Sequence, residues 1–121
     1  MLAKTIIEMI ARRASKQLQC NDMQKIKFVF MYKTDELKVI AEDKLKDGKE
    51  VTRHGAPQKI SDNAELNAMF TDRINKKLKP ESITAIASEW DYINEKINTI
   101  VLFIKDGEKK KHEENINFNE A

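Results

Sequence analysis

Apolar residues follow a helical repeat in two segments of the chain. In residues 2–18 an apolar stripe recurs every three or four positions, with charged residues outside it (Leu2, Ile6, Met9, Ile10, widened by Ile7 and Ala14). A second stripe runs through residues 62–78 (Leu66, Met69, Phe70, Ile74, Leu78). Asp62 and Glu65 resemble a capping box, in which each side chain accepts a hydrogen bond from a free backbone N–H near the helix start. Pro80 ends this predicted helix, because the residue before a proline is pushed out of helical geometry.

Elsewhere the repeat changes to every second residue, which is typical of strands. The clearest case is "KIKFVFMYK" at 25–33, where Ile26, Phe28, Phe30 and Tyr32 share one face and Val29 and Met31 share the other. Further strands are predicted at 37–46, 49–53, 83–92, 98–105 and 108–118. Asp47-Gly48 and Asp106-Gly107 predict tight hairpin turns, because both residue types tolerate the positive φ that such turns require. The lysines after the second turn are predicted to protect an edge strand (Lys109, Lys110, Lys111).

The element order α-β-β-β-α-β-β-β predicts an α+β fold, with an antiparallel β-sheet and two helices packed on one of its faces. Residues 1–121 are predicted to form a single domain. The two predicted helices begin about 60 positions apart, and both Asp-Gly turns fall in the same slot of the element order. This spacing permits a duplication of an αβββ unit, 1–58 and 59–118. Recurrence of the topology without common ancestry is the alternative.

The composition is that of a globular protein with a highly charged surface. Of 121 residues, 40% are hydrophobic and 35% are charged, with three glycines and two prolines. No apolar run approaches the roughly 18 residues that span a bilayer, so no membrane association is expected. The single cysteine excludes an internal disulfide and is consistent with a reducing compartment. The N-terminus does not resemble a signal peptide, because Glu8 interrupts its apolar part. These features predict a cytoplasmic protein.

The common catalytic and metal-binding motifs are missing. A zinc site needs about four Cys, His or carboxylate ligands at local spacings, whereas this chain has two separated histidines and one cysteine. No nucleophile elbow surrounds any serine, and the three glycines do not form a phosphate-binding loop. Glu89 and Asp91 share a strand face, but Trp90 and Tyr92 on the opposite face favour solvated acids beside a core. We therefore predict a non-enzymatic protein with no metal and no cofactor.

Two groups of basic residues are candidates for anion or nucleic-acid contacts. Arg12, Arg13 and Lys16 lie on the first predicted helix, and the first third of the chain carries an excess of positive charge. Arg53 and His54 stand in the loop before the second helix, whose N-terminus attracts anions. The alternatives are an ordinary solvated helix face and a plain connecting loop.

The strand at 25–33 is apolar on both faces, so it must be covered twice. Two helices cover about one face of such a sheet, which leaves the other for a second subunit or a partner protein. The candidate interface residues are Phe28, Val29, Phe30 and Met31. Strands that curl and bury both faces within one chain are the alternative.

The leading prediction is thus a small intracellular binding protein, adaptor-, chaperone- or inhibitor-like, that forms homodimers or docks a protein partner. The alternative is a nucleic-acid-binding accessory protein that uses the basic N-terminal helix. No motif identifies a family.

Overall fold

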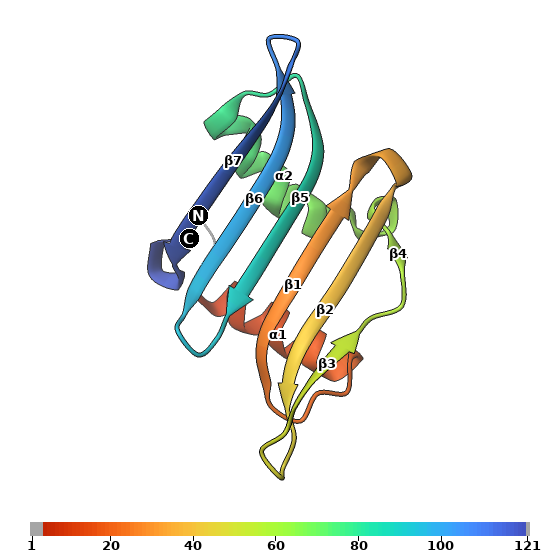
Figure 1. Ribbon diagram of the computed structural model, residues 1–121, viewed down its shortest axis with the longest axis vertical. Coiled ribbons are helices and arrows are strands. Elements are labelled where there is room, and N and C mark those ends of the chain that lie inside the picture. The colour runs from red at the N-terminus through yellow and green to blue at the C-terminus, as the bar shows by residue number, and fades with distance from the viewer. Residues whose placement is uncertain (1–3, 121) are drawn as a thin grey trace.

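The computed structural model describes residues 4–120, which form two helices and seven strands (Figure 1). The helices are α1 (Lys4–Gln17) and α2 (Ala64–Leu78). The strands are β1 (Met23–Met31), β2 (Glu36–Lys44), β3 (Glu50–His54), β4 (Gln58–Lys59), β5 (Ser82–Asp91), β6 (Lys96–Lys105) and β7 (Glu108–Asn117). Short 3-10 turns follow β1, β4 and β7 (Tyr32–Thr34, Ile60–Asn63, Phe118–Glu120).

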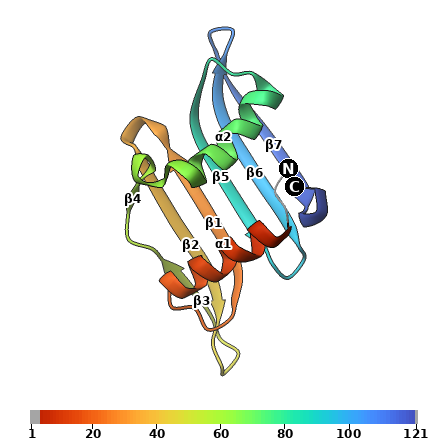
Figure 2. The same ribbon diagram turned by 180° about the vertical axis from the view of Figure 1, so that it is seen from behind.

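The strands form one antiparallel sheet in the order β3-β2-β1-β5-β6-β7, with the two-residue β4 added beside β2. Both helices lie on the same face of this sheet, and the other face has no helix over it (Figures 1 and 2). The predicted α+β class is therefore confirmed, and the predicted element order matches except for the additional short strand β4. The sheet does not curl to bury both its faces, since Met31 and Leu102 on the helix-free side are 43% and 42% exposed.

The start of the second helix differs from the sequence-based prediction. The helix begins at Ala64, and Asp62 lies before it in a 3-10 turn. The predicted capping box is wrong, because Asn63 is the N-cap and makes no side-chain cap hydrogen bond. The turn is held instead by Asp35, whose carboxylate accepts hydrogen bonds from the backbone N–H and the hydroxyl of Ser61 (3.1 and 2.6 Å). This contact joins residues far apart in sequence, so local patterning does not reveal it.

The core lies between the helices and the sheet and is centred on aromatic side chains. Phe28, Phe30, Phe70 and Trp90 are all buried, and their rings meet in tilted or edge-on pairs 5.1–5.9 Å apart. Such pairs add about 0.5–1.5 kcal/mol beyond the effect of burial alone. The indole N–H of Trp90 donates to the Ser88 hydroxyl at 2.9 Å, so its polar atom is satisfied inside the core.

The two halves of the molecule correspond position by position. Phe28 and Ser88 pair with each other where β1 meets β5, and they lie 60 positions apart in the sequence. The same separation of 60 positions relates residues with left-handed φ angles, which follow the helices and lie in the first hairpin turn of each half. Gln19 and Lys79 have left-handed φ angles of 55° and 48°, and Asp35 and Glu95 have 52° and 53°. Residues 60 positions apart thus occupy equivalent places around a pseudo-two-fold axis. Their origin in a duplicated unit stays a prediction.

Candidate functional site

The helix-free face of the sheet, called the open face below, carries an apolar patch across three central strands. The patch is formed by side chains that alternate with buried core residues (Val29, Met31, Ala85, Ala87, Ile100, Leu102). Strand register arranges them in two adjacent rows. Met31, Ala85 and Leu102 are paired in one row, and Val29, Ala87 and Ile100 in the next. None of the six is buried, and a contiguous apolar patch of this kind is uncommon on the surface of a monomer.

Each row of the patch ends in a charged residue on either side. The first row runs from Glu36 on β2 to Lys111 on β7, and the second from Lys38 to Glu113. Glu36 and Lys38 form an ion pair with each other at 3.5 Å. These four residues form the charged rim of the patch. The two ends of each row are opposite in charge, and so are the two rim residues on β2 and the two on β7.

The four interface residues predicted from the sequence lie on opposite faces of the sheet, two on each face. Phe28 and Phe30 point to the helix side and are only 3% and 0% exposed, so they belong to the core and cannot reach a partner. Val29 and Met31 lie on the open face. Periodicity placed the two pairs on opposite faces, but it did not show which face the helices cover.

The predicted basic cluster on the first helix is exposed, and it stands on the helix side of the sheet. Arg12, Arg13 and Lys16 are all solvent-accessible, and α1, which carries them, lies over the covered face of the sheet (Figure 2). Lys25 and Lys27, which extend the positive charge in the sequence, lie on the open face instead. There Lys25 forms an ion pair with Glu89 at 3.9 Å. The positive charge of the N-terminal third is therefore divided between two faces of the molecule.

The predicted pair Arg53 and His54 is also separated, because consecutive strand residues point to opposite faces. His54 is exposed on the open face opposite Ile40. The Arg53 Nε donates to the Asp43 carboxylate at 2.7 Å. The structure therefore does not bring these two residues together with the start of α2, and Arg53 is already engaged by a carboxylate.

Asp43 is the most deeply buried acid of the described residues, with no exposed surface. Its carboxylate also accepts hydrogen bonds from the backbone N–H groups of Asn21 and Asp22 (2.9 and 2.7 Å). Burial alone would raise the pKa of Asp43, but these donors and Arg53 hold it below the ordinary value. Burial and the Asp43 charge raise the pKa of the nearby Cys20 thiol. The cluster anchors the segment between α1 and β1, and both carboxylate oxygens of Asp43 accept hydrogen bonds within it.

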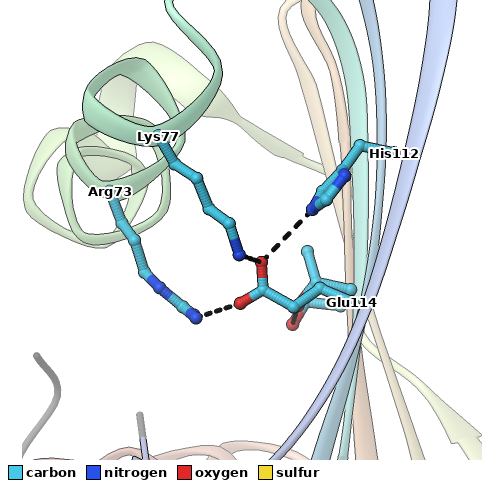
Figure 3. A network of polar contacts seen from close by, with 6 residues as sticks. Arg73, Lys77, His112 and Glu114 are labelled. Atoms are coloured by element: carbon cyan, nitrogen blue, oxygen red, sulfur yellow. Dashed lines mark hydrogen bonds and ion pairs between the residues drawn. The ribbon is translucent and has the colours of Figure 1, made fainter.

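A second polar cluster lies between α2 and the edge strand β7 (Figure 3). Arg73 and Lys77 project from one face of α2 toward Glu114, and His112 approaches the same carboxylate from β7 at 3.4 Å. Lys77 Nζ lies 2.8 Å from a Glu114 oxygen. Burial raises the pKa of Glu114, but the Lys77 hydrogen bond and the Arg73 charge outweigh it and lower the pKa.

Sequence reasoning missed this cluster, although two patterns could have indicated it. Arg73 and Lys77 are four positions apart on a helix, and His112 and Glu114 are two apart on a strand, so each pair shares a face. The cluster covers a cavity of about 30 Å³ against Phe70 and Trp90. That volume holds about one or two waters.

The remaining candidates have structural roles. Trp90 is buried, as predicted, while Glu89 pairs with Lys25 and Asp91 accepts hydrogen bonds from the turn at residues 93–94. Burial raises the pKa of Asp91, but the hydrogen bonds from Asn94 outweigh this effect and lower the pKa. Among residues 4–120, no three His, Cys, Asp or Glu side chains are grouped so as to hold a metal ion. Within that same range, neither helix has the length and apolar character that crossing a membrane requires.

No protein-family model, curated protein or solved structure matches this chain. The geometry of its surface is therefore the basis on which a function can be proposed.

Proposed function

We propose that the protein is a small, non-enzymatic intracellular binding protein that forms a homodimer through the open face of its sheet. The observation that carries this proposal is the two-row apolar patch with its charged rim. Burial of one large apolar side chain contributes about 1.5–3 kcal/mol, so covering such a patch favours association. A second copy supplies a cover of matching size and chemistry.

The open face is large enough for a stable interface. Five strands of nine or ten residues and the five-residue β3, about 4.8 Å apart and rising about 3.3 Å per residue, give a face of roughly 840 Å². A standard protein interface buries roughly 800 Å² on each partner. Two such sheets pack about 10 Å apart with their strands nearly aligned, as in β-sandwiches.

The patch is also complementary to itself. A two-fold axis parallel to the strands and centred on β5 places Met31 over the partner's Leu102 and Val29 over the partner's Ile100. Ala85 and Ala87 then lie at the axis, where their small side chains allow close approach. The same operation brings Glu36 over the partner's Lys111 and Lys38 over the partner's Glu113, so the rim charges are opposite in sign. Isologous contacts of this kind close on themselves and limit assembly to a dimer.

Sedimentation or light scattering of the purified chain at micromolar concentration tests the proposal. We expect the mass of a dimer for the unchanged protein and of a monomer for Leu102→Glu, which would bury two charges against apolar surface. Ile93→Glu is the matched control, because Ile93 is 63% exposed in the turn between β5 and β6 and lies outside the patch. A monomeric unchanged protein, or equal effects of the two substitutions, would contradict the proposal.

A further inference from the structure

The pseudo-two-fold symmetry gives the cavity beneath α2 a counterpart beneath α1. Six residues that line this second cavity lie 60 positions before residues that line the first (Ile10, Arg13, Ala14, Gln17, Leu37, Val39). The helix and the outer of the two lining strands contribute to both cavities in the same way, whereas the central strands contribute the non-equivalent residues Phe28 and Trp90.

The two cavities differ at the position of the acid. In the second half, Thr99 pairs with Glu114, whose carboxylate binds Arg73. In the first half, the place next to Val39 is taken by Gly55, whose N–H donates to the Val39 carbonyl at 2.8 Å. Gly55 brings no carboxylate, and within residues 4–120 Arg13 takes part in no ion pair. The arginine is thus repeated in both halves, but its acid is present in only one.

The cavity beneath α1 is also the larger of the two. It has a volume of about 160 Å³, against about 30 Å³ for the cavity beneath α2. A smaller residue lines it at one equivalent position, where Ala14 stands in place of Ile74. Its floor is apolar (Ile10, Phe28, Leu37, Val39, Leu66), and its polar groups are one guanidinium and three amides (Arg13, Gln17, Gln58, Asn63). An apolar floor with a few polar groups on one side is the usual composition of a small-molecule site.

We propose that this cavity binds a small aliphatic monocarboxylate. The ligand carboxylate pairs with Arg13, as Glu114 pairs with Arg73 in the other half, and the amide of Gln17 donates to it. The short hydrocarbon body fills the apolar floor. A guanidinium is suited to this role because its N–H groups match the two oxygens of a carboxylate. The site lies on the helix side of the sheet, so occupancy does not depend on association through the open face.

Titration with isovalerate, followed by NMR of the backbone amides, tests this site. We expect saturable shifts confined to the residues that line the cavity, with a dissociation constant of about 1 mM for a ligand of about seven heavy atoms. Isovaleramide has the same shape without the charge and should bind at least about ten-fold more weakly. Equal binding of acid and amide, or the absence of saturable shifts at these residues, would overturn the proposal.

Two pairs of variants distinguish specific binding in this cavity from nonspecific electrostatic attraction of an anion to the basic helix α1. Arg13→Gln should weaken binding about ten-fold, whereas Arg12→Gln removes the same charge from an exposed neighbour that does not line the cavity and should leave it unchanged. Gln17→Lys reproduces the Arg73–Lys77 arrangement and should tighten binding about two- to five-fold, and Gln17→Glu should weaken it. All three positions are exposed at the surface, so the four variants should fold. Equal effects of the two arginine substitutions would refute the site.

Discussion

Tyr32 and Tyr92 occupy equivalent places after the two central strands, and each donates its hydroxyl hydrogen to the helix of the opposite half. Tyr32 donates to the side-chain oxygen of Asn67 in α2 at 2.7 Å, and Tyr92 to the Ile7 carbonyl in α1 at 3.3 Å. Burial raises the pKa of both hydroxyls, which keeps them protonated as donors. The two tyrosines therefore tie the halves together from both sides of the pseudo-two-fold axis.

Replacing either tyrosine by phenylalanine should lower the free energy of unfolding without disturbing the core. Each ring keeps its packing, since Tyr32 stacks on Phe30 and Tyr92 meets Phe118 edge-on. Loss of one hydroxyl hydrogen bond should cost about 0.5–1.5 kcal/mol, with the larger effect at Tyr32, whose bond is shorter. Urea unfolding followed by circular dichroism measures both values. Unchanged stability of Tyr32→Phe would show that its hydroxyl is not a structural tie.

Asp43→Asn should destabilise the fold more strongly, by about 2–3 kcal/mol, because Arg53 and two backbone N–H groups would lose a buried anionic acceptor. The pKa of Asp43 is lowered in the folded state, so its contribution is present above the ordinary aspartate pKa of 3.8 and is lost as the pH falls below it. Unfolding experiments at neutral and acidic pH should therefore show a difference between the two proteins that shrinks with acidification.

Asp62→Asn is the control for this measurement, because Asp62 is exposed in the 3-10 turn before α2. Its effect should stay within about 0.5 kcal/mol at every pH. A difference between Asp43→Asn and the unchanged protein that persists or grows in acid would be incompatible with a depressed pKa at Asp43.

Periodicity predicted most of the fold, because the helices and long strands are defined by local patterns. Alternation in β1 placed Phe28 and Val29 on opposite faces, and the Asp-Gly turns marked both outer hairpins. The strand β4 was not predicted, because it has only two residues and they pair with Glu36 and Leu37, which are distant in the sequence. The start of α2 was misplaced for a similar reason, since Asp35 holds the preceding turn from 26 positions away.

The candidate sites were harder to predict, because they depend on which elements become neighbours. Arg53 looked like a free cation in its loop, but the register of β3 on β2 brings it to the buried Asp43. Glu114 follows another glutamate in a charged segment, and nothing local distinguishes the two, yet the packing of α2 against β7 places Glu114 between two cations. The open-face patch combines residues from β1, β5 and β6, and strand order is not encoded in any one segment.

The proposed dimer makes a specific prediction about charge pairs. With a two-fold axis parallel to the strands, Lys111 faces the partner's Glu36, so Lys111→Glu should create two repulsive contacts per dimer. Exposed ion pairs contribute about 0.2–1 kcal/mol each, so the dimer dissociation constant should rise by up to about thirty-fold. Adding Glu36→Lys should restore association, because it reverses the other member of the same pair.

A two-fold axis across the strands would instead place Lys111 opposite the partner's Glu113, and Glu113→Lys would then be the restoring substitution. Sedimentation equilibrium of the single variant and of both double variants distinguishes these orientations. Low salt should enlarge every difference, because the rim residues are solvent-exposed and their interactions are screened. Restoration by Glu36→Lys alone supports the axis parallel to the strands. Restoration by Glu113→Lys alone would reject that axis while retaining the open-face dimer, and restoration by neither would place the rim charges outside the interface.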